Sequence, residues 1–255
     1  TALDQDKNSA DIAKELSKKN NNFSFSKINF KNLEIFKQKN IYKKFNLILL
    51  DLGFSSNQLE NEYIGLSFKI NSKLNMNYLD GDLSAFEIIN EYNVNELHRV
   101  FKDYGEINNS KKLSEFIIKV RSQKKIETNF DLIDTLRESG VNFRSKKIHF
   151  ATQAFQALRI EANKEIDNLK FFLDNVHLYL KNKGLLAIIS FHSLEDRIVK
   201  NYFKSNSCKK NNYFLNNSDW GFEILTKRPI TPSKDEINSN NRSRSAKLRV
   251  GEFVN

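Results

Sequence analysis

Acidic and hydroxyl side chains follow apolar segments at two places in the chain. Asp4 follows a short apolar stretch, and Asp51-Leu-Gly-Phe-Ser-Ser56 follows the apolar run Phe45–Leu50. Ligands of open α/β sheets bind at the carboxyl ends of strands, where an acid commonly accepts hydrogen bonds from ribose hydroxyls. We therefore predict that Asp4 and Asp51 face a ligand. The alternatives are that Asp4 caps the helix that follows it and that residues 51–56 are an ordinary strand-to-helix turn.

A further polar segment, Ser190-Phe-His-Ser-Leu-Glu-Asp-Arg197, also follows an apolar run. Hydrolase chemistry is disfavoured because the side chains of His192 and Ser193 are adjacent and diverge, and a Gly-x-Ser-x-Gly elbow is absent. The alternative is helix capping, with Ser193 as the N-cap and Glu195 in the first turn, where negative charge suits the helix dipole. The four histidines show no metal-ligand spacing, so we expect no metal site.

The elements that position these residues follow from the apolar pattern. Phe45–Leu50 and Leu185–Phe191 are nearly continuous apolar runs, which predict parallel strands covered on both faces. An apolar stripe from Ile166 to Leu180 predicts a helix before the second strand, with Gly184 as its C-terminal stop. Residues 1–30 fit the same scheme, with a strand ending at Asp4, a helix over 10–19 and a strand over 23–28. The pattern predicts an α/β fold.

Residues 84–143 have a different, purely helical pattern. Ser84-Ala-Phe-Glu87 has capping-box spacing, and apolar stripes predict helices ending at Gly105 and passing through Leu113 and Ile117. A third helix is predicted from Thr128 to before Gly140, with Phe130 and Ile133 on its apolar face. We expect an all-helical insert at 84–143 between two parts of the α/β domain, residues 1–83 and 144–255.

The tail combines expected strands with basic loops. Trp220–Thr226 is predicted as a strand, Lys227–Ser233 as a basic loop, and Arg242–Arg249 as a basic run into a last strand. The Asn-rich stretch Ser205–Ser218 is predicted as a loose loop.

Composition limits the class of protein. The chain has 255 residues and a net charge of +10, which favours a polyanionic partner such as nucleic acid, although lineage bias or solubility would give the same excess. The single cysteine, Cys208, excludes an internal disulfide and a cysteine-based metal cluster, and it fits a reducing cytoplasm. The chain shows no signal peptide and no apolar run approaching the ~20 residues of a membrane span, so we expect a cytoplasmic protein with no membrane partner.

Six motifs, taken together, resemble one family. They are Ala2-Leu-Asp-Gln-Asp6, Asp51-Leu-Gly-Phe-Ser-Ser-Asn-Gln-Leu59, Gly65-Leu-Ser-Phe68, Phe155-Gln-Ala-Leu-Arg-Ile160, Ser190-Phe-His-Ser-Leu-Glu-Asp-Arg-Ile-Val-Lys200 and Arg244-Ser-Ala-Lys-Leu-Arg249. In this order they resemble the bacterial small-subunit (16S) ribosomal RNA cytosine-N4 methyltransferases, the RsmH or MraW family. The resemblance implies a Rossmann-like class I methyltransferase fold with an inserted helical domain, and S-adenosyl-L-methionine as cofactor.

The resemblance also implies roles for particular residues. Asp4 would hold the cofactor ribose, Phe30 would lie by the adenine, and Asp51 and Gln58 would complete the cofactor site. The turn from Asp51 to Ser56 lies where amino-methyltransferases hold the target amine. Catalytic candidates are therefore Asp51, Ser55 and His192, with no dedicated base expected.

The expected partner is small-subunit ribosomal RNA or the assembled small ribosomal subunit. The residues predicted to contact RNA are the basic residues of the insert and tail: Lys111, Lys112, Lys124, Lys125, Lys227, Arg228, Arg242, Arg244 and Lys247. An alternative function is a non-catalytic RNA-binding or ribosome-assembly factor that retains the fold. A DNA amino-methyltransferase is disfavoured because its Asn/Asp-Pro-Pro-aromatic motif is absent.

The chain departs from the family pattern in three places. Leu74-Asn-Met-Asn-Tyr78 replaces Leu-Asp-Met-Arg-Met, and His149-Phe-Ala-Thr-Gln153 replaces His-Pro-Ala-x-basic, which affects positions Asn75, Asn77, Phe150 and Gln153. The glycine-rich cofactor loop and first strand of the family would lie upstream of Thr1. We expect the chain to begin inside the domain, which would leave Phe45–Leu50 without one neighbouring strand and weaken cofactor binding.

Overall fold

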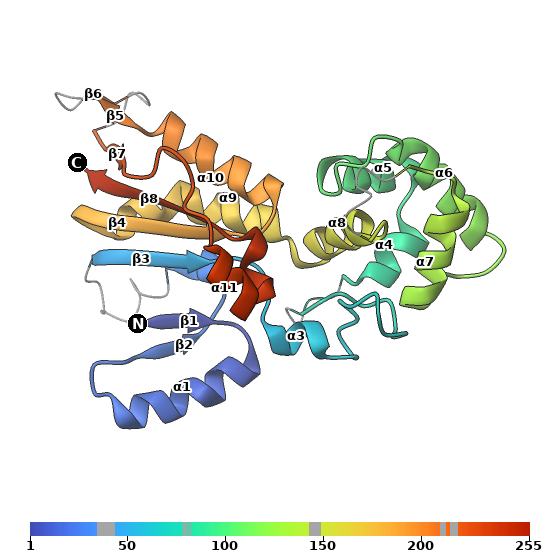
Figure 1. Ribbon diagram of the computed structural model, residues 1–255, viewed down its shortest axis with the longest axis horizontal. Helices are drawn as coiled ribbons and strands as arrows, with labels where there is room; N and C mark the ends of the chain where they lie inside the picture. Colours follow the sequence, from blue (N-terminus) through green and yellow to red (C-terminus); the bar gives the residue numbers. More distant parts are fainter. Residues whose placement is uncertain (35–43, 79–80, 82, 143–148, 210–212, 215–218) are drawn as a thin grey trace. The chain divides into compact units, whose positions relative to one another are not determined.

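The computed structural model describes residues 1–34, 44–78, 81, 83–142, 149–209, 213–214 and 219–255. The chain forms two compact units (Figure 1). Unit 1 consists of residues 1–27 and 54–165, and unit 2 of residues 28–53 and 166–255.

A four-stranded mixed sheet forms the centre of unit 2. Its strands, in the order β3-β4-β8-β7, are β3 (Phe45–Asp51), β4 (Leu180–Ser190), β8 (Lys247–Val254) and β7 (Gly221–Ile224). β3 and β4 are parallel, as predicted from their apolar runs, whereas β8 is antiparallel to both β4 and β7. Asp51 pairs with Ile189, so the carboxyl ends of β3 and β4 lie at the same edge of the sheet.

The start of β4 corrects one prediction. The helix predicted to run through Leu180 ends earlier, as α9 (Glu165–Asn175) followed by the 3-10 helix η2 (Val176–Tyr179), and Leu180 opens the strand. Gly184 lies within β4 and is not a helix stop. The pairing register with β3 shifts here, and a Cβ on Gly184 would lie 2.9 Å from the carbonyl oxygen of Phe45. Glycine therefore allows the close approach of the two strands at this irregularity.

Helix α10 (Ser193–Ser205) packs on β4, β7 and β8. Its Phe203 meets β8 at Gly251, where a Cβ would lie 2.6 Å from the ring. Phe203 also packs edge-on against Phe222 of β7, with ring centroids 5.4 Å apart. At the other side of the sheet, β3 is an edge strand within the described chain, and its Leu47 and Leu49 are exposed.

The remaining elements of unit 2 are short. They are η1 (Phe30–Asn32), β5 (Cys208–Lys209), β6 (Tyr213–Phe214), α11 (Lys234–Ser239) and η3 (Asn241–Ser245). β5 and β6 pair in an antiparallel manner, so the described part of the stretch predicted as a loose loop contains paired strands. The predicted strands of the tail are confirmed as β7 and β8.

Unit 1 begins with a βαβ motif. β1 (Ala2–Asp4) and β2 (Phe25–Lys27) pair in parallel through α1 (Lys7–Lys19), as the first 30 residues predicted.

Helices make up most of the remaining described elements of unit 1. Its helices are α3 (Ser56–Glu60), α4 (Ala85–Glu91), α5 (Val94–Asp103), α6 (Ser110–Arg121), α7 (Asn129–Glu138) and α8 (Thr152–Asn163). The predicted capping box from Ser84 to Glu87 is present, and Thr128 caps α7 through a box with Asp131. The predicted core residues Leu113 and Ile117 are fully buried, but Phe130 is 43% exposed and does not face the core.

The helical core extends beyond residues 84–143. Leu74 and Met76 precede the predicted insert, and Ala154 and Leu158 of α8 follow it, yet all four are buried in one cluster with the insert helices. Helix α8 packs on both α4 and α5 (Figure 1). The second segment of unit 1 therefore spans 54–165, because long-range packing joins flanking residues to the helices. Among the described residues, no helix is both long and apolar enough to cross a bilayer.

Candidate functional site

The carboxyl end of β3 presents Asp51 to solvent. The next residue, Leu52, donates its backbone N–H to the carbonyl of Ile189 at 3.0 Å, which keeps the chain on the sheet for one more residue. Gly53 then turns with a φ of +97°, a conformation that favours glycine. A Cβ at Gly53 would be 3.8 Å from the Phe191 ring, in ordinary contact. The tight turn predicted at Gly53 is thus present, and backbone conformation rather than crowding explains the glycine.

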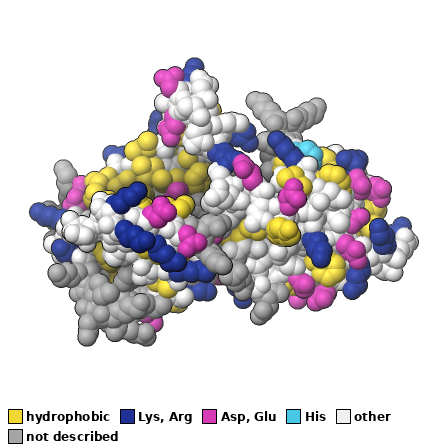
Figure 2. All heavy atoms as spheres, turned by 90° about the horizontal axis from the view of Figure 1, so that it is seen from below, with side chains coloured by type: hydrophobic (Ala, Val, Ile, Leu, Met, Phe, Trp, Pro, Cys, Tyr) yellow, Lys and Arg dark blue, Asp and Glu magenta, His cyan; other side chains and the backbone are white. Residues whose placement is uncertain are grey.

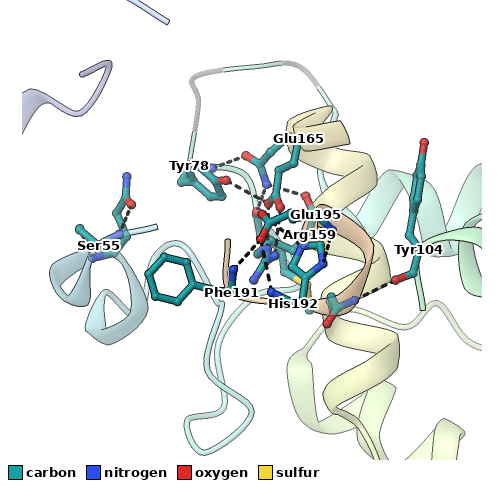
Figure 3. Close-up of polar contacts among 12 residues, drawn as sticks. Ser55, Tyr78, Tyr104, Arg159, Glu165, Phe191, His192 and Glu195 are labelled. Carbon is teal, nitrogen blue, oxygen red and sulfur yellow. Dashed lines mark hydrogen bonds and ion pairs between the residues drawn. The ribbon is translucent and has the colours of Figure 1, made fainter. Parts of the chain in front are cut away.

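The carboxyl end of β4 is shaped by a reciprocal cap between His192 and Glu195 (Figure 3). The Nδ1 atom of His192 accepts the backbone N–H of Glu195 at 3.3 Å. The Glu195 carboxylate accepts the backbone N–H groups of Phe191, at 2.8 Å, and of His192, at 3.4 Å.

The prediction that Ser193 is the N-cap is therefore wrong, because His192 holds that position. The signal was present in the sequence, since Glu195 lies three residues after His192, which is capping-box spacing. His192 Nε2 lies 3.2 Å from Glu195 Oε1, and both side chains are almost completely buried. The structure thus gives His192 a positioning role at the edge of the sheet.

The charge of one carboxylate of unit 2 affects the pKa of another at this edge. Although Asp51 remains exposed, partial loss of hydration raises the pKa of its carboxyl, and the negative charge of Glu195 raises it further. An edge with two acids attracts cationic groups and hydrogen-bond donors.

Phe30, the predicted adenine neighbour, lies in η1 of the same unit. Its ring packs edge-on against Phe172 of α9, with centroids 5.6 Å apart. The side chain is only partly buried, so it retains surface for a further contact.

The other predicted cofactor residues, Asp4 and Gln58, belong to unit 1. Asp4 Oδ1 accepts the backbone N–H of Asp6 at 2.8 Å, so one oxygen supports the turn into α1. Gln58 and Ser55 form a capping box at the start of α3, with Ser55 N–H donating to Gln58 Oε1 at 2.8 Å and Gln58 N–H to Ser55 Oγ at 3.2 Å. A capping box is therefore present at Ser55, whereas Asp4 supports a turn before α1, and both contacts fix the local backbone.

A buried ionic network in unit 1 escaped the sequence analysis (Figure 3). Arg159 of α8 forms a bidentate pair with Glu165, at 2.8 and 3.0 Å, and the hydroxyl of Tyr78 donates to Glu165 at 2.9 Å. The guanidinium also lies over the ring of Phe54, 4.8 Å from its centroid. Lys164, with a φ of +50°, ends α8 and lets Glu165 fold back toward Arg159. Phe54 and Glu165 are the first and last residues of the second segment of unit 1, and Arg159 contacts both.

A second ionic group, in unit 2, joins α10 to β8. Arg249, which is buried, donates to both oxygens of Asp196, at 2.7 and 3.3 Å. Lys247, one of the predicted RNA residues, lies 3.4 Å from the same carboxylate. These cations lower the pKa of Asp196. Asp196 therefore serves as the anchor of the motif that ends at Arg249.

Most of the predicted RNA-contacting residues are exposed: Lys111, Lys112, Lys124, Lys125, Lys227, Arg228, Arg242 and Arg244. Some also have protein contacts. Lys124 lies 3.7 Å from Asp131, and Lys125 lies over the ring of Phe86. Figure 2 shows acidic side chains interspersed with lysines and arginines on the face that it displays. Positive charge is therefore not segregated on that face.

Comparison with known proteins gives the family. A model described as the MraW methylase family matches residues 1–254. The chain belongs to this family. The Ribosomal RNA small subunit methyltransferase H of Sulfurihydrogenibium sp. (strain YO3AOP1) is 42% identical over 255 residues, which cover 99% of this chain and 83% of that protein. Its counterpart from Rickettsia bellii (strain RML369-C) is 41% identical over 263 residues, which cover 100% and 85%.

This member of the MraW family departs from the family pattern at positions that have structural contacts. Asn77 donates to the carbonyls of Gly81 and Leu83, both at 2.8 Å, and Gln153 donates to the carbonyl of Gly105 at 2.9 Å. Asn75 Nδ2 donates to the carbonyl of Tyr63 at 3.2 Å. The departing side chains thus hold loops of unit 1 in place.

The departure at Phe150 places an aromatic ring against two other side chains of unit 1. Its centroid lies 4.6 Å from the ring of His149 and 5.7 Å from the guanidinium carbon of Arg137. The position therefore also contributes packing.

Proposed function

We propose that this chain transfers a methyl group from S-adenosyl-L-methionine to the N4 amine of a cytosine in small-subunit ribosomal RNA. The observation that carries the proposal is membership of the MraW methylase family along residues 1–254. The acidic edge formed by Asp51 and Glu195 at the ends of parallel strands supports it, because this is where α/β proteins bind nucleotide-like ligands.

The chemistry asks the protein mainly for alignment. The lone pair of a cytosine N4 amine is delocalised into the ring, and S-adenosyl-L-methionine supplies an already activated methyl group. Asp51 is the residue expected to accept a hydrogen bond from the target amine or the cofactor, which orients the reacting groups. Ser55 and His192 each hold their local backbone through a capping box, and neither has to move a proton.

The side chains predicted to form the cofactor site match the chemistry of the cofactor. S-adenosyl-L-methionine carries positive sulfonium and ammonium groups together with ribose hydroxyls that donate hydrogen bonds. The carboxylates of Asp4 and Asp51 match these features, Phe30 offers a partly buried ring for the adenine, and Gln58 lies in the helix after the turn. We infer that these four residues contact the cofactor.

The partner is small-subunit ribosomal RNA, free or in the assembled subunit. The exposed basic residues of α6 and the tail would neutralise phosphates, and the released counterions would drive binding. The target base must leave its stack to reach the site, at a cost of a few kcal/mol, unless it already lies in a loop.

Mass spectrometry of ribosomal RNA tests the proposal. Small-subunit RNA from cells that lack the gene should lose one N4-methylated cytosine, and complementation with the wild-type gene should restore it. Complementation with Asp51→Ala should leave the base unmethylated. An unchanged methylation pattern after deletion would contradict the proposal and favour a non-catalytic assembly factor.

A further inference from the structure

Tyr63 has the most exposed of the large hydrophobic side chains in the described chain. Its side chain is 89% exposed, against 60% for the next, Ile12. It lies in unit 1, between α3 and the segment around Leu74 that enters the helical core. A large ring held so far in water contributes little to folding, so a different role is open to it.

The backbone that carries this ring is fixed on both sides. Asn61 Oδ1 accepts the N–H of Tyr63 at 2.9 Å, and Asn75 Nδ2 donates to the Tyr63 carbonyl at 3.2 Å. The next residue, Ile64, accepts the N–H of Met76 at 2.6 Å.

Gly65 closes the same loop. It has a φ of +71°, and a Cβ there would lie 2.5 Å from the carbonyl oxygen of Lys73, so no other residue fits without a shift of the backbone. The ring of Tyr63 is therefore presented from an ordered loop, which has little conformational entropy to lose when a partner binds.

Lysines lie on segments bonded to this loop. Lys73 is exposed, and its backbone pairs with that of Thr128, while Leu74 N–H donates to the Glu127 carbonyl at 2.9 Å. The exposed Lys124 and Lys125 lie just before this paired segment. An aromatic ring with basic residues on adjoining segments is the combination that binds unpaired nucleic acid, with rings stacking on bases and lysines following the backbone.

The residues beside Tyr63 favour a contact with a base over a contact with a phosphate. Glu60, at the end of α3, and Glu62, on the loop, are exposed, and their negative charge disfavours a phosphate directly at the ring. A base is uncharged and offers a flat apolar face, so it fits this position better than the RNA backbone does.

We propose that Tyr63 stacks on an unpaired base of the RNA substrate, next to the phosphate contacts made by Lys73, Lys124 and Lys125. This rests on the proposed function, because it takes the ribosomal RNA as the ligand. Tyr63 is then a positioning residue that holds substrate and takes no part in methyl transfer.

Kinetics with three variants test the stacking. With small-subunit ribosomal RNA as substrate, Tyr63→Ala should raise KM for RNA by about 5- to 150-fold, which is the range for loss of one base–aromatic stack. The kcat and the affinity for S-adenosyl-L-methionine should stay unchanged. Tyr63→Phe should behave as wild type, because the ring is retained. The control Phe130→Ala removes another exposed ring of unit 1 and should leave KM unchanged.

Several outcomes would overturn the proposal. One is a wild-type KM for Tyr63→Ala, and another is an equal loss in Tyr63→Phe, which would assign the effect to the hydroxyl. A defect seen with assembled subunits but not with naked RNA would assign the ring to a protein contact. Direct RNA binding by the same variants separates this proposal from the function: if wild type binds RNA and loses affinity only in Tyr63→Ala, but transfers no methyl group, stacking stands and the proposed reaction fails.

Discussion

Two glutamates with little exposed surface, one in each unit, are held in different ways. Glu165 of unit 1 is matched by the guanidinium of Arg159 and the hydroxyl of Tyr78. Glu195 of unit 2 is held by backbone N–H groups and by His192, and its charge still acts on Asp51, whose pKa it helps to raise. The carboxylate of Glu165 anchors the fold through its pair with a guanidinium, whereas the charge of Glu195 also raises the pKa of a neighbouring acid. The comparison separates residues that build the molecule from residues that tune the site.

The largest effect is expected at Asp51, whose pKa Glu195 helps to raise. Asp51→Ala should lower kcat for ribosomal RNA methylation by about 100-fold or more, on the scale of removing one aligned polar contact from a reacting group. The fold should not suffer. Because the folded state raises the pKa of Asp51, ionised Asp51 opposes folding, and this penalty grows as pH rises from its unfolded pKa through its folded pKa.

Thermal melting at neutral pH should therefore show Asp51→Ala to be at least as stable as wild type. Asp235→Ala, at an exposed acid of α11, is the matched control and should retain full activity. Turnover at the wild-type rate in Asp51→Ala would remove Asp51 from the mechanism.

Loss of the Arg159–Glu165 pair should lower the free energy of unfolding. The side chains of Arg159 and Glu165 are only 14% and 10% exposed, so removing one partner leaves a buried charge. Arg159→Met or Glu165→Gln should lower the free energy of unfolding by about 3–5 kcal/mol. The loss in the double variant should be well below the sum of the single losses, because both single changes break the same pair.

Denaturant unfolding of the two single variants and the double variant measures this coupling. Tyr78→Phe is the graded control and should cost about 1 kcal/mol, since it removes one hydrogen bond and leaves the ion pair. Additive losses from Arg159→Met and Glu165→Gln would show that the pair is not the source of the stability.

These two groups also show what local sequence can predict. The apolar runs predicted β3 and β4, and with them the position of Asp51, because period and burial are local properties. Arg159 and Glu165 are six residues apart, which is not a helix-face spacing, and only the left-handed turn at Lys164 brings them together. Pairing across a turn and packing against Phe54 and Tyr78 are tertiary properties that the sequence pattern does not contain.

The same distinction explains why one helix end was predicted wrongly and why the helical core includes residues outside 84–143. Leu180 continued the apolar stripe of the preceding helix, so periodicity alone could not detect that it opens β4. Residues 84–143 were a helical block in the sequence, but Leu74, Met76 and α8 joined its core by long-range contacts. Local pattern predicts the type of element reliably, whereas its ends and its partners depend on packing.

The two units can also be compared by how much the basic residues of each contribute to the predicted RNA binding. We predict that neutralising Lys111, Lys112, Lys124 and Lys125 in unit 1, or Arg242, Arg244 and Lys247 in unit 2, weakens RNA binding and flattens its salt dependence. Removing one cation that neutralises a phosphate should change the slope of log affinity against log salt by about 0.7–0.9. Lys247 should contribute less than Arg242 or Arg244, because it already lies by Asp196.

Titration of labelled RNA at several salt concentrations gives both slopes, and calorimetry with S-adenosyl-L-methionine is the control, since cofactor affinity should barely change. If one set alone flattens the slope, that unit carries the RNA. If the slope of log affinity against log salt is unchanged in both sets, the net charge of +10 serves solubility and not RNA binding.

The smallest expected effect tests the comparison itself. Glu195→Gln keeps an amide oxygen that can accept the N–H groups of Phe191 and His192, so the cap at β4 should survive, but the negative charge is lost. The pKa of Asp51 should fall, because one of the two causes that raise it is removed. If Asp51 works as a carboxylate, the acidic limb of kcat/KM against pH should move to lower pH, while the rate on the plateau changes little. Glu165→Gln, the corresponding change in unit 1, should lower stability and leave that limb in place. A limb that stays fixed in Glu195→Gln, or that moves in both variants, would mean that the charge of Glu195 does not tune Asp51.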